Sequence, residues 1–243
     1  MNLQDFSALC RQHFANNALP CPTEEQIQAL FTLTEHMLKV NQSMNLTAIK
    51  EEEAVIVKHY VDSLLIANAI PEGATVLDVG CGAGFPTLPL AIFRPDLRIT
   101  ALDSTAKRIQ YVQSTADLLG LTHVTAIAAR AEELAHDPKH RESYDVVTAR
   151  AVAALPVLAE LCLPFARIDG RFVAMKAKQA DEELTSATNA IRLCGGRVKE
   201  IERTALRLNE TESDPRVIAI IEKISATPQN YPRHFSKISK KPL

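Results

Sequence analysis

Apolar residues recur at helical spacing through the first 70 positions of the chain. Three such series are present, and the second begins after Thr23–Gln26, which has the form of a capping box. The third begins at three acidic residues, 51–53, which favour the positive N-terminal end of a helix. The series comprise Leu3, Phe6, Leu9, Cys10 and Phe14; then Ile27, Leu30, Phe31, Thr34, Met37 and Leu38; then Val55, Ile56, His59, Tyr60, Ser63 and Leu64. This pattern predicts a helical segment over residues 1–70.

From Pro71 onward, short apolar runs alternate with helical patterns. The runs predict five strands, over residues 75–79, 98–103, 124–128, 145–149 and 171–176, and an antiparallel pair over 198–206 and 217–223. Helices are predicted over 87–93, 105–119 and 181–194. The alternation predicts an α/β fold: a mostly parallel, seven-stranded Rossmann-like sheet with an antiparallel edge hairpin over residues 71–224, between the N-terminal helical extension and a basic tail, residues 225–243. Right-handed crossovers would place the first strand centrally, beside the switch point where ligands bind.

The first predicted strand runs into three glycines at alternate positions, Gly80, Gly82 and Gly84. A dinucleotide-binding loop needs its third glycine one position later, where Phe85 stands, so a pyrophosphate cofactor is disfavoured. The spacing resembles motif I of Rossmann-like S-adenosylmethionine-dependent methyltransferases. Pro86 stands where a helix would start, and free N–H groups of that helix could face an anionic group such as a carboxylate. The alternative is a turn that binds no ligand.

Composition excludes several classes of protein. A length of 243 residues suits one medium domain with an appended segment, or two small domains. The 27 basic and 29 acidic residues give a formal charge of −2, which argues against bulk electrostatic binding of nucleic acid, so any RNA partner must meet local patches. The start of the chain lacks the features of a signal peptide, and the most apolar stretch, residues 151–166, is too short and too interrupted to span a membrane. We therefore expect a cytoplasmic protein without a membrane partner.

The cysteines and histidines do not indicate a metal site. Five widely spaced cysteines include no Cys-x-x-Cys pair, so neither a disulfide framework nor a zinc site is predicted. His136 and His140 have the spacing of a metal pair on a helix, but Pro138 lies between them, and we expect an exposed loop. His59 and Asp62 can meet on one helical face, where a hydrogen bond within the helix and a role at a substrate mouth both remain open.

Three polar positions follow neighbouring predicted strands. Asp103 ends the second strand, 23 positions after Gly80, where its carboxylate could accept both hydroxyls of an adenosine ribose or simply cap the next helix. After the third strand, residues 128–133 would suit an adenine edge or form a solvated charged turn, and on their own they favour the turn. After the fourth comes Arg150, which can contact a carboxylate, a phosphate or a guanine edge, or pair with a structural carboxylate.

Taken together, these stretches resemble the bacterial RsmG family, also called glucose-inhibited division protein B. The resemblance lies in Leu77–Pro86, Leu102–Arg108, Arg130–Glu133 and Thr148–Ala151, with Asn45-Leu46-Thr47 and His59–Ser63 upstream and Tyr231-Pro232-Arg233 and the Lys-Lys-Pro-Leu end downstream. It implies methyl transfer from S-adenosylmethionine to N7 of a guanine in the 530 loop of 16S ribosomal RNA. The implied partner is 16S rRNA or the small ribosomal subunit.

Carried over by position, the resemblance implies cofactor contacts at Gly80, Phe85, Ala131, Glu132 and Arg150, with Asp103, Ser104 and Thr105 flanking the ribose. Many members have glycine where this chain has Thr87, so the first turn of that helix is expected to be less open to the ligand. The tail supplies the predicted RNA contacts, Arg233, Lys237, Lys240 and Lys241, together with Arg150, although such tails are often only solvated.

The predicted chemistry needs no acid or base. Guanine N7 has an exposed lone pair and no proton, so transfer requires positioning rather than proton removal, and we expect no catalytic acid, base or nucleophile. Two alternatives remain open: a cofactor-binding RNA or regulatory module without transfer activity, and a small-molecule methyltransferase with the helical segment as a lid. A dehydrogenase is a more distant alternative.

Overall fold

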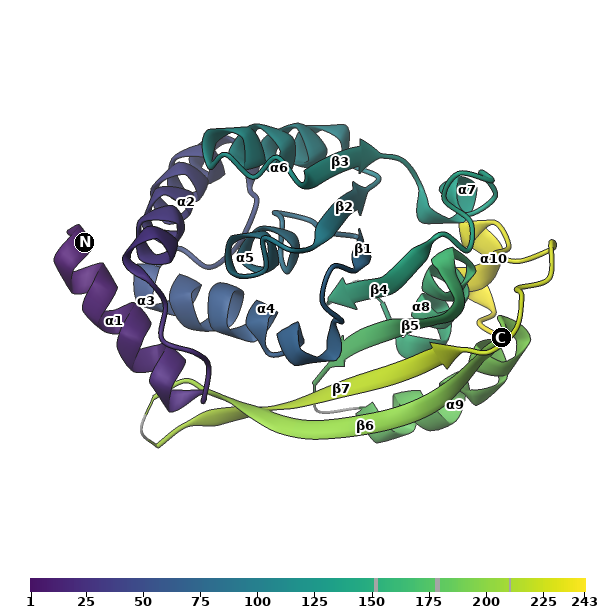
Figure 1. The fold of residues 1–243 in the computed structure, drawn as a ribbon. Coiled ribbons are helices and arrows are strands. Elements are labelled where there is room, and N and C mark those ends of the chain that lie inside the picture. The colour runs from purple at the N-terminus through teal and green to yellow at the C-terminus, as the bar shows by residue number, and fades with distance from the viewer. Residues whose placement is uncertain (151–152, 178–179, 210) are drawn as a thin grey trace.

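The computed structural model describes residues 1–150, 153–177, 180–209 and 211–243, so Ala151, which ends one quoted motif, lies outside the described residues. Seven strands form one sheet in the order β3-β2-β1-β4-β5-β7-β6 (Figure 1). β1 to β5 are parallel, and β7 is antiparallel to both β5 and β6. The strands are β1 Thr75–Val79, β2 Arg98–Asp103, β3 Val124–Ala128, β4 Tyr144–Arg150, β5 Ala166–Lys176, β6 Gly196–Arg207 and β7 Ser213–Lys223. The predicted fold class is confirmed, with β1 inside the sheet.

Helices cover both faces of the sheet, α1 to α6 on one side and α7 to α10 on the other (Figure 1). They are α1 Leu3–Asn16, α2 Glu24–Met44, α3 Glu52–Val55, α4 Asp62–Leu64, α5 Thr87–Phe93, α6 Ala106–Leu118, α7 Ala131–Leu134, α8 Leu155–Cys162, α9 Ala180–Leu193 and α10 Phe235–Lys240. Successive strand residues point to opposite faces, so Val76 joins the hydrophobic cluster under α1 to α6 and Leu77 joins the cluster under α8 to α10. The apolar runs of the strands therefore serve two cores.

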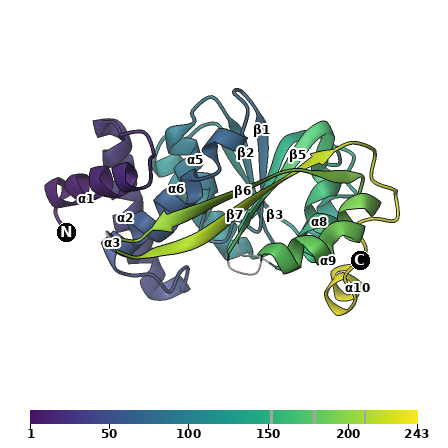
Figure 2. The same ribbon diagram turned by 90° about the horizontal axis from the view of Figure 1, so that it is seen from below.

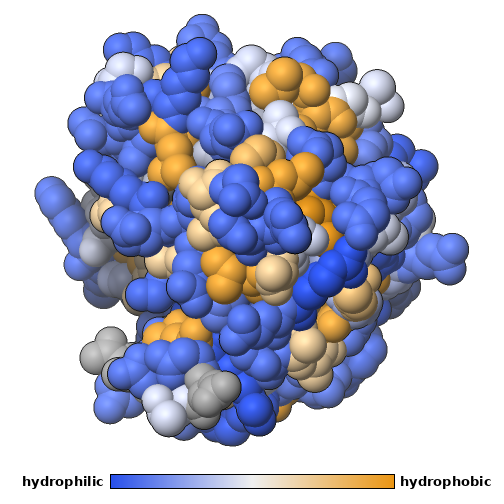
Figure 3. Space-filling model, turned by 90° about the vertical axis from the view of Figure 1, so that its left-hand side faces the viewer, coloured by the Kyte–Doolittle hydropathy of each residue, from blue (hydrophilic) through white to orange (hydrophobic). Residues whose placement is uncertain are grey.

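The N-terminal helices follow the predicted pattern. Thr23 and Gln26 form the capping box of α2, with both reciprocal hydrogen bonds present. α3 and α4 are the two ends of one helix, and the turn between them, Ile56–Val61, is π-helical. Their apolar sides share a cluster with α5 and α6, and the surface over this end of the molecule is mostly hydrophilic with scattered apolar residues (Figure 3). π-helical turns are frequent at functional sites, and this one contains His59.

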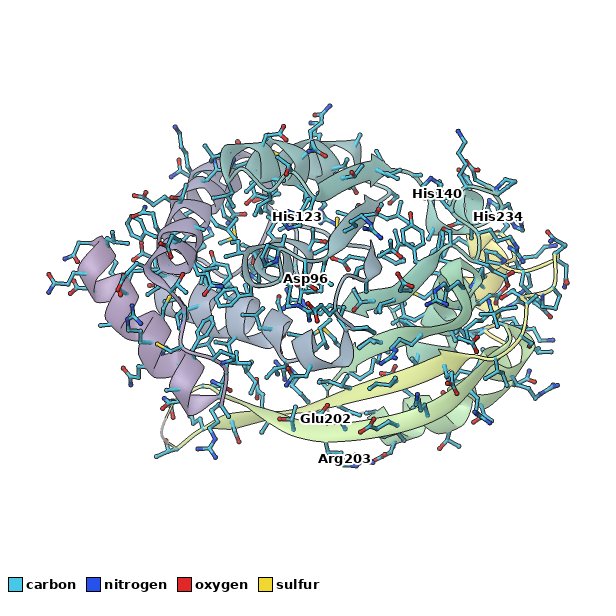
Figure 4. All side chains as sticks on the ribbon, viewed as in Figure 1. Asp96, His123, His140, Glu202, Arg203 and His234 are labelled. Atoms are coloured by element: carbon cyan, nitrogen blue, oxygen red, sulfur yellow. The ribbon has the colours of Figure 1, made fainter. Side chains whose placement is uncertain are left out.

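The β6–β7 hairpin is longer than predicted, and its tip reaches the N-terminal helices (Figures 1 and 2). The side-chain amide of Asn17 donates to the backbone carbonyl of Arg207 (3.1 Å) and accepts from its backbone N–H (2.8 Å). The outer strand β6 carries exposed charged residues, Glu202 and Arg203 among them, along the free edge of the sheet (Figure 4). Charged side chains on an edge strand oppose pairing with other chains.

The buried helix α8 and the C-terminal helix α10 were not predicted, and neither was the short helix α7. All eight residues of α8 are buried, and Pro156 stands in its first turn, where proline is tolerated. The tail is ordered rather than only solvated: the Arg141 guanidinium donates to the carbonyls of Thr227 (2.7 Å), Pro228 (3.2 Å) and Tyr231 (3.0 Å). These bonds hold the C-terminal segment against the sheet domain.

Candidate cofactor and substrate cleft

A cleft of about 490 Å³ opens at the carboxyl ends of β1, β2, β3 and β4. All eight residues predicted as cofactor contacts line it: Gly80, Phe85, Asp103, Ser104, Thr105, Ala131, Glu132 and Arg150. They come from four different strand ends, and the parallel sheet brings those ends to one edge. The fold thus brings together predicted residues as far apart in the sequence as Gly80 and Arg150.

The glycine loop forms one wall of this cleft. Gly80 and Gly84 have positive φ angles, +73° and +87°, which residues with a Cβ atom rarely adopt. A Cβ on Gly84 would also lie 2.6 Å from Leu88 Cδ1, so this glycine is required for packing of the loop on α5. The loop glycines therefore serve the turn and its packing as well as access to a ligand.

The first turn of α5 faces the interior instead of the cleft. Thr87 and Leu88 are fully buried, and the Thr87 hydroxyl donates to Asp78 Oδ2 (2.7 Å). The backbone N–H of Leu88 already donates to the Gly84 carbonyl (2.8 Å), so this group of the first turn is not free to bind an anionic ligand. Burial raises the pKa of Asp78 to about 6, since only one of its carboxylate oxygens has a partner.

Asp103 joins the glycine loop to the start of α6. Its Oδ2 accepts the backbone N–H of Gly82 (3.1 Å), and its Oδ1 accepts that of Thr105 (2.8 Å). The two interpretations of Asp103 are thus compatible, because a carboxylate has about four acceptor positions and these bonds use two of them. The oxygens can still accept the two hydroxyls of a ribose.

Glu132 presents a buried carboxylate to the cleft. The residue is 5% exposed, and its Oε1 has no hydrogen-bond partner. The nearest cation is the Arg130 guanidinium, at 3.6 Å, and the Arg130 side chain is half exposed at the rim. A carboxylate oxygen without a hydrogen bond is costly to bury, so a donor group of a ligand is the expected partner of Oε1.

A second group of lining residues is a compact stack of Phe85, His59 and Arg150. The rings of His59 and Phe85 are parallel, 4.2 Å between centroids, and the Arg150 guanidinium lies 5.6 Å from the centroid of Phe85. His59 also contacts Thr47 Oγ1 through Nε2 (2.9 Å) and Arg150 through Nδ1 (3.4 Å). Burial and the Arg150 charge lower the pKa of His59 to about 3, so its imidazole is neutral.

Asp62 fixes Arg150 in this stack. Its Oδ2 accepts Arg150 Nη1 (3.0 Å), and its Oδ1 accepts Arg216 Nε from β7 (2.7 Å). Arg150 Nη1 also donates to the carbonyl of Lys58 (3.0 Å). Arg150 therefore has the structural carboxylate partner that the sequence left open, while it still lines the cleft. His59 and Asp62 act on the same arginine.

The tail contributes to the site in two ways. The Arg233 guanidinium makes two bonds to Glu160, which is fully buried, at 2.8 and 2.6 Å, so it forms an internal ion pair. Lys237, Lys240 and Lys241 are exposed on and just after α10. Phe235, the first residue of α10, lines the cleft.

No other reactive group was found among the described residues. Cys81 lines the cleft, but burial raises the pKa of its thiol well above the ordinary value, so it is not a thiolate. His136 bonds to the Pro232 carbonyl (3.0 Å) and His140 to the Tyr144 hydroxyl (2.7 Å); His140 and His234 both lie toward the end of the molecule that carries α10 (Figure 4). In the part of the chain that the structure describes, no group of three or more potential metal ligands is present, and no helix could cross a membrane.

Several lining residues were not predicted as site residues. They include Leu46, Thr47, His59, Arg108, Ala129, Arg130 and Phe235. Leu46 and Thr47 belong to the Asn-Leu-Thr stretch already quoted for the family resemblance, which could have directed attention to them. Phe235 had no such signal, since an apolar residue in a basic tail has many explanations.

Comparison with known proteins gives one consistent result. The family described as "GidB: rRNA small subunit methyltransferase G" matches residues 26–210. The protein named ribosomal RNA small subunit methyltransferase G from Halalkalibacterium halodurans is 47% identical to this chain over 209 residues, which cover 85% of this chain and 87% of the relative. The protein of the same name from Alkaliphilus metalliredigens is 43% identical over 222 residues, which cover 90% of this chain and 92% of the relative. Among solved structures, the Bacillus cereus O-methyltransferase in complex with SAH has a TM-score of 0.55 at 17% identity, covering 91% of this chain and all of that one. The M. jannaschii TYW2 structure with AdoMet has a TM-score of 0.54 at 18% identity, covering 68% and 75%.

Proposed function

Because the chain belongs to the rRNA small subunit methyltransferase G family, we propose that it methylates N7 of a guanine in the 530 loop of bacterial 16S rRNA, using S-adenosylmethionine. The observation that carries this proposal is the cleft itself, in which eight residues from four strand ends and the glycine loop meet. When bound, S-adenosylmethionine would supply a methyl group attached to a positively charged sulfur. The N7 lone pair would form the new bond to the methyl carbon while the C–S bonding electrons return to sulfur.

The lining residues fit this cofactor. Asp103 has acceptor positions left for two ribose hydroxyls, and the unpartnered Oε1 of Glu132 can accept from a further hydroxyl or amino group. Ala131 is small and leaves space beside them. These residues would hold the adenosine part of the cofactor.

The chain needs no catalytic acid or base for this reaction. N7 has no proton to lose, and neither ring nitrogen of His59 is free, because each already has a hydrogen-bond partner. The contribution of the protein is to hold the two reactants in line, which in favourable systems lowers a barrier by about 7–11 kcal/mol. Rigid, well-bonded residues around the cleft suit that task.

Local basic groups at the rim support RNA as the substrate. Arg108 and Arg130 line the cleft with half-exposed side chains, and Lys237, Lys240 and Lys241 lie exposed on and just after α10, whose first residue lines the cleft. Such a patch can contact phosphates although the whole chain has a net charge of −2.

The test is methyl transfer to small-subunit particles and to naked 16S rRNA, both from cells that lack the modification. Labelled S-adenosylmethionine and strand cleavage specific for N7-methylguanine should reveal one modified guanine in the 530 loop. Cofactor binding without any such cleavage would overturn the proposal and favour a binding module. Transfer to a small molecule but not to RNA would favour a small-molecule methyltransferase.

A further inference from the structure

Thr47 is held rigidly at the mouth of the cleft. It lies in the loop between α2 and α3, and its side chain is part of the lining. The side-chain amide of Asn41 binds both backbone groups of Thr47: Nδ2 donates to its carbonyl (2.9 Å) and Oδ1 accepts from its N–H (2.9 Å). The position of the Thr47 hydroxyl is therefore fixed from behind.

The contacts of His59 determine which atom donates and which accepts in its hydrogen bond with the Thr47 hydroxyl. The guanidinium of Arg150 can only donate, so His59 Nδ1 must accept at the 3.4 Å contact. The proton of the neutral imidazole then resides on Nε2, which donates to Thr47 Oγ1 at 2.9 Å. The low pKa of His59 keeps this tautomer from becoming a cation.

The acceptor capacity of the Thr47 hydroxyl is thereby used up. Oγ1 also accepts the backbone N–H of Ile49 at 3.1 Å, so both of its lone pairs are occupied. Within residues 1–150, 153–177, 180–209 and 211–243, no hydrogen bond has this hydroxyl as its donor. The hydroxyl can therefore act towards a bound molecule only as a donor.

We propose that the Thr47 hydroxyl donates to O6 of the target guanine and thereby selects guanine over adenine. This inference rests on the proposed N7 transfer. The edge of guanine that carries N7 also carries the acceptor O6, whereas adenine has a donor amino group there. Because the N7 lone pair must stay free for the methyl group, O6 is the acceptor that remains. An adenine would place two donors against each other.

Thr47 differs in origin from the residues assigned to the cofactor. Asp103 and Glu132 follow strands of the sheet, whereas Thr47 belongs to the helical segment that precedes it. His59 and Asn41, which orient Thr47, belong to the same segment. The helical segment thus supplies the group that reads the base, and the sheet supplies the groups that hold the methyl donor.

The experiment compares the wild type with Thr47→Val, which keeps the shape but lacks the hydroxyl, and with Thr47→Ser, which retains it. Single-turnover transfer is measured on particles reconstituted with the target guanine or with 2-aminopurine, which retains N7 but lacks O6. We expect Thr47→Val to reduce transfer to guanine about 10- to 100-fold, as when one hydrogen bond to a base is removed, and Thr47→Ser to retain most of it. The effects of Thr47→Val and 2-aminopurine should not add, because both remove the same bond.

Cofactor affinity, measured by calorimetry, provides the second readout. It should be the same in the wild type and Thr47→Val; a parallel loss would mean that the hydroxyl binds the cofactor and would overturn the inference. Equal transfer by the two proteins, or additive effects with 2-aminopurine, would overturn it as well. If Thr47→Val does not fold, the wild type alone decides, since equal rates on guanine and 2-aminopurine would refute the O6 bond. A wild type that modifies no guanine overturns the proposed function together with this inference.

Discussion

The ring of Phe85, in the glycine loop, lies parallel to the imidazole of His59, with 4.2 Å between centroids. The loop after β1 therefore rests on a residue of the helical segment, and the same imidazole contacts Thr47 and Arg150. The glycine loop, the Thr47 hydroxyl and the arginine at the end of β4 meet at one neutral histidine. Each of these parts can be perturbed separately.

His59 should make the protein less stable in mild acid. Its pKa is about 3 in the folded protein and about 6.5 when unfolded, so below pH 6.5 the unfolded state binds the extra proton. The contribution of His59 to the free energy of unfolding is therefore fully present above pH 6.5. It falls as pH decreases, by about 2 kcal/mol at pH 5. Urea unfolding of the wild type and His59→Asn at pH 7.5 and pH 5 should show a change with pH that is about 2 kcal/mol more destabilising in the wild type than in the variant. Asp78 titrates in both proteins and cancels in the comparison; equal pH dependence would contradict the prediction.

The Asp62 pairs should contribute more to stability than an exposed pair. Asp62→Asn leaves Arg150 and Arg216 without their shared carboxylate, and breaking such a partly buried pair costs about 3–5 kcal/mol. Glu222→Gln, which removes the partner of the exposed Arg197 on the same hairpin, is the matched control and should leave Tm nearly unchanged. Thermal unfolding checks both. Similar Tm values for the two variants would show that Asp62 does not hold the segments together.

Glu132 should bind the cofactor, while its neighbour Glu133 should not. Glu132 is buried in the cleft lining and has an unpartnered oxygen, whereas Glu133 is exposed. Glu132→Gln is expected to weaken S-adenosylmethionine binding about tenfold, for the loss of one charge-assisted hydrogen bond, and Glu133→Gln to leave it unchanged. Calorimetric titration measures both. Unchanged affinity in Glu132→Gln would remove this residue from the proposed cofactor site.

The basic tail should divide into a structural arginine and RNA-binding lysines. Arg233→Ala would leave the buried Glu160 unpaired and is expected to cost about 3–5 kcal/mol of stability. Replacing Lys237, Lys240 and Lys241 with alanine should keep Tm and weaken RNA binding, with a salt slope reduced by about 0.7–0.9 for each phosphate that a lysine neutralises in the wild type. Binding measured from 50 to 200 mM salt, a range wide enough to resolve this difference, gives the slope. An unchanged slope would mean that the lysines are only solvated.

The sequence predicted the elements whose signals are local. The capping box at Thr23 was found as predicted, and Gly80 and Asp103 line the cleft at the ends of the first two strands. Element ends were less well placed, because the β6–β7 hairpin continues beyond its apolar part as paired backbone.

The missing parts of the site depend on distant contacts. Arg233 looked like an RNA contact because its partner, Glu160, lies 73 positions away on a helix that no periodicity indicated. Thr47 and Phe235 belong to the cleft only because the helical segment and the tail pack against its two ends. Short-range patterns do not contain this information.

The two hydrogen bonds between Asn17 and Arg207 can form only late in the synthesis of the chain. Its partners are separated by 190 residues, so the first helix can be emerging from a ribosome long before Arg207 has been made. Until then Asn17 lacks its partner on the hairpin, and the loop that closes when the two residues pair is most of the chain. The enzyme proposed to modify the ribosome can therefore join the end of its first helix to the hairpin only after the ribosome has made most of its chain.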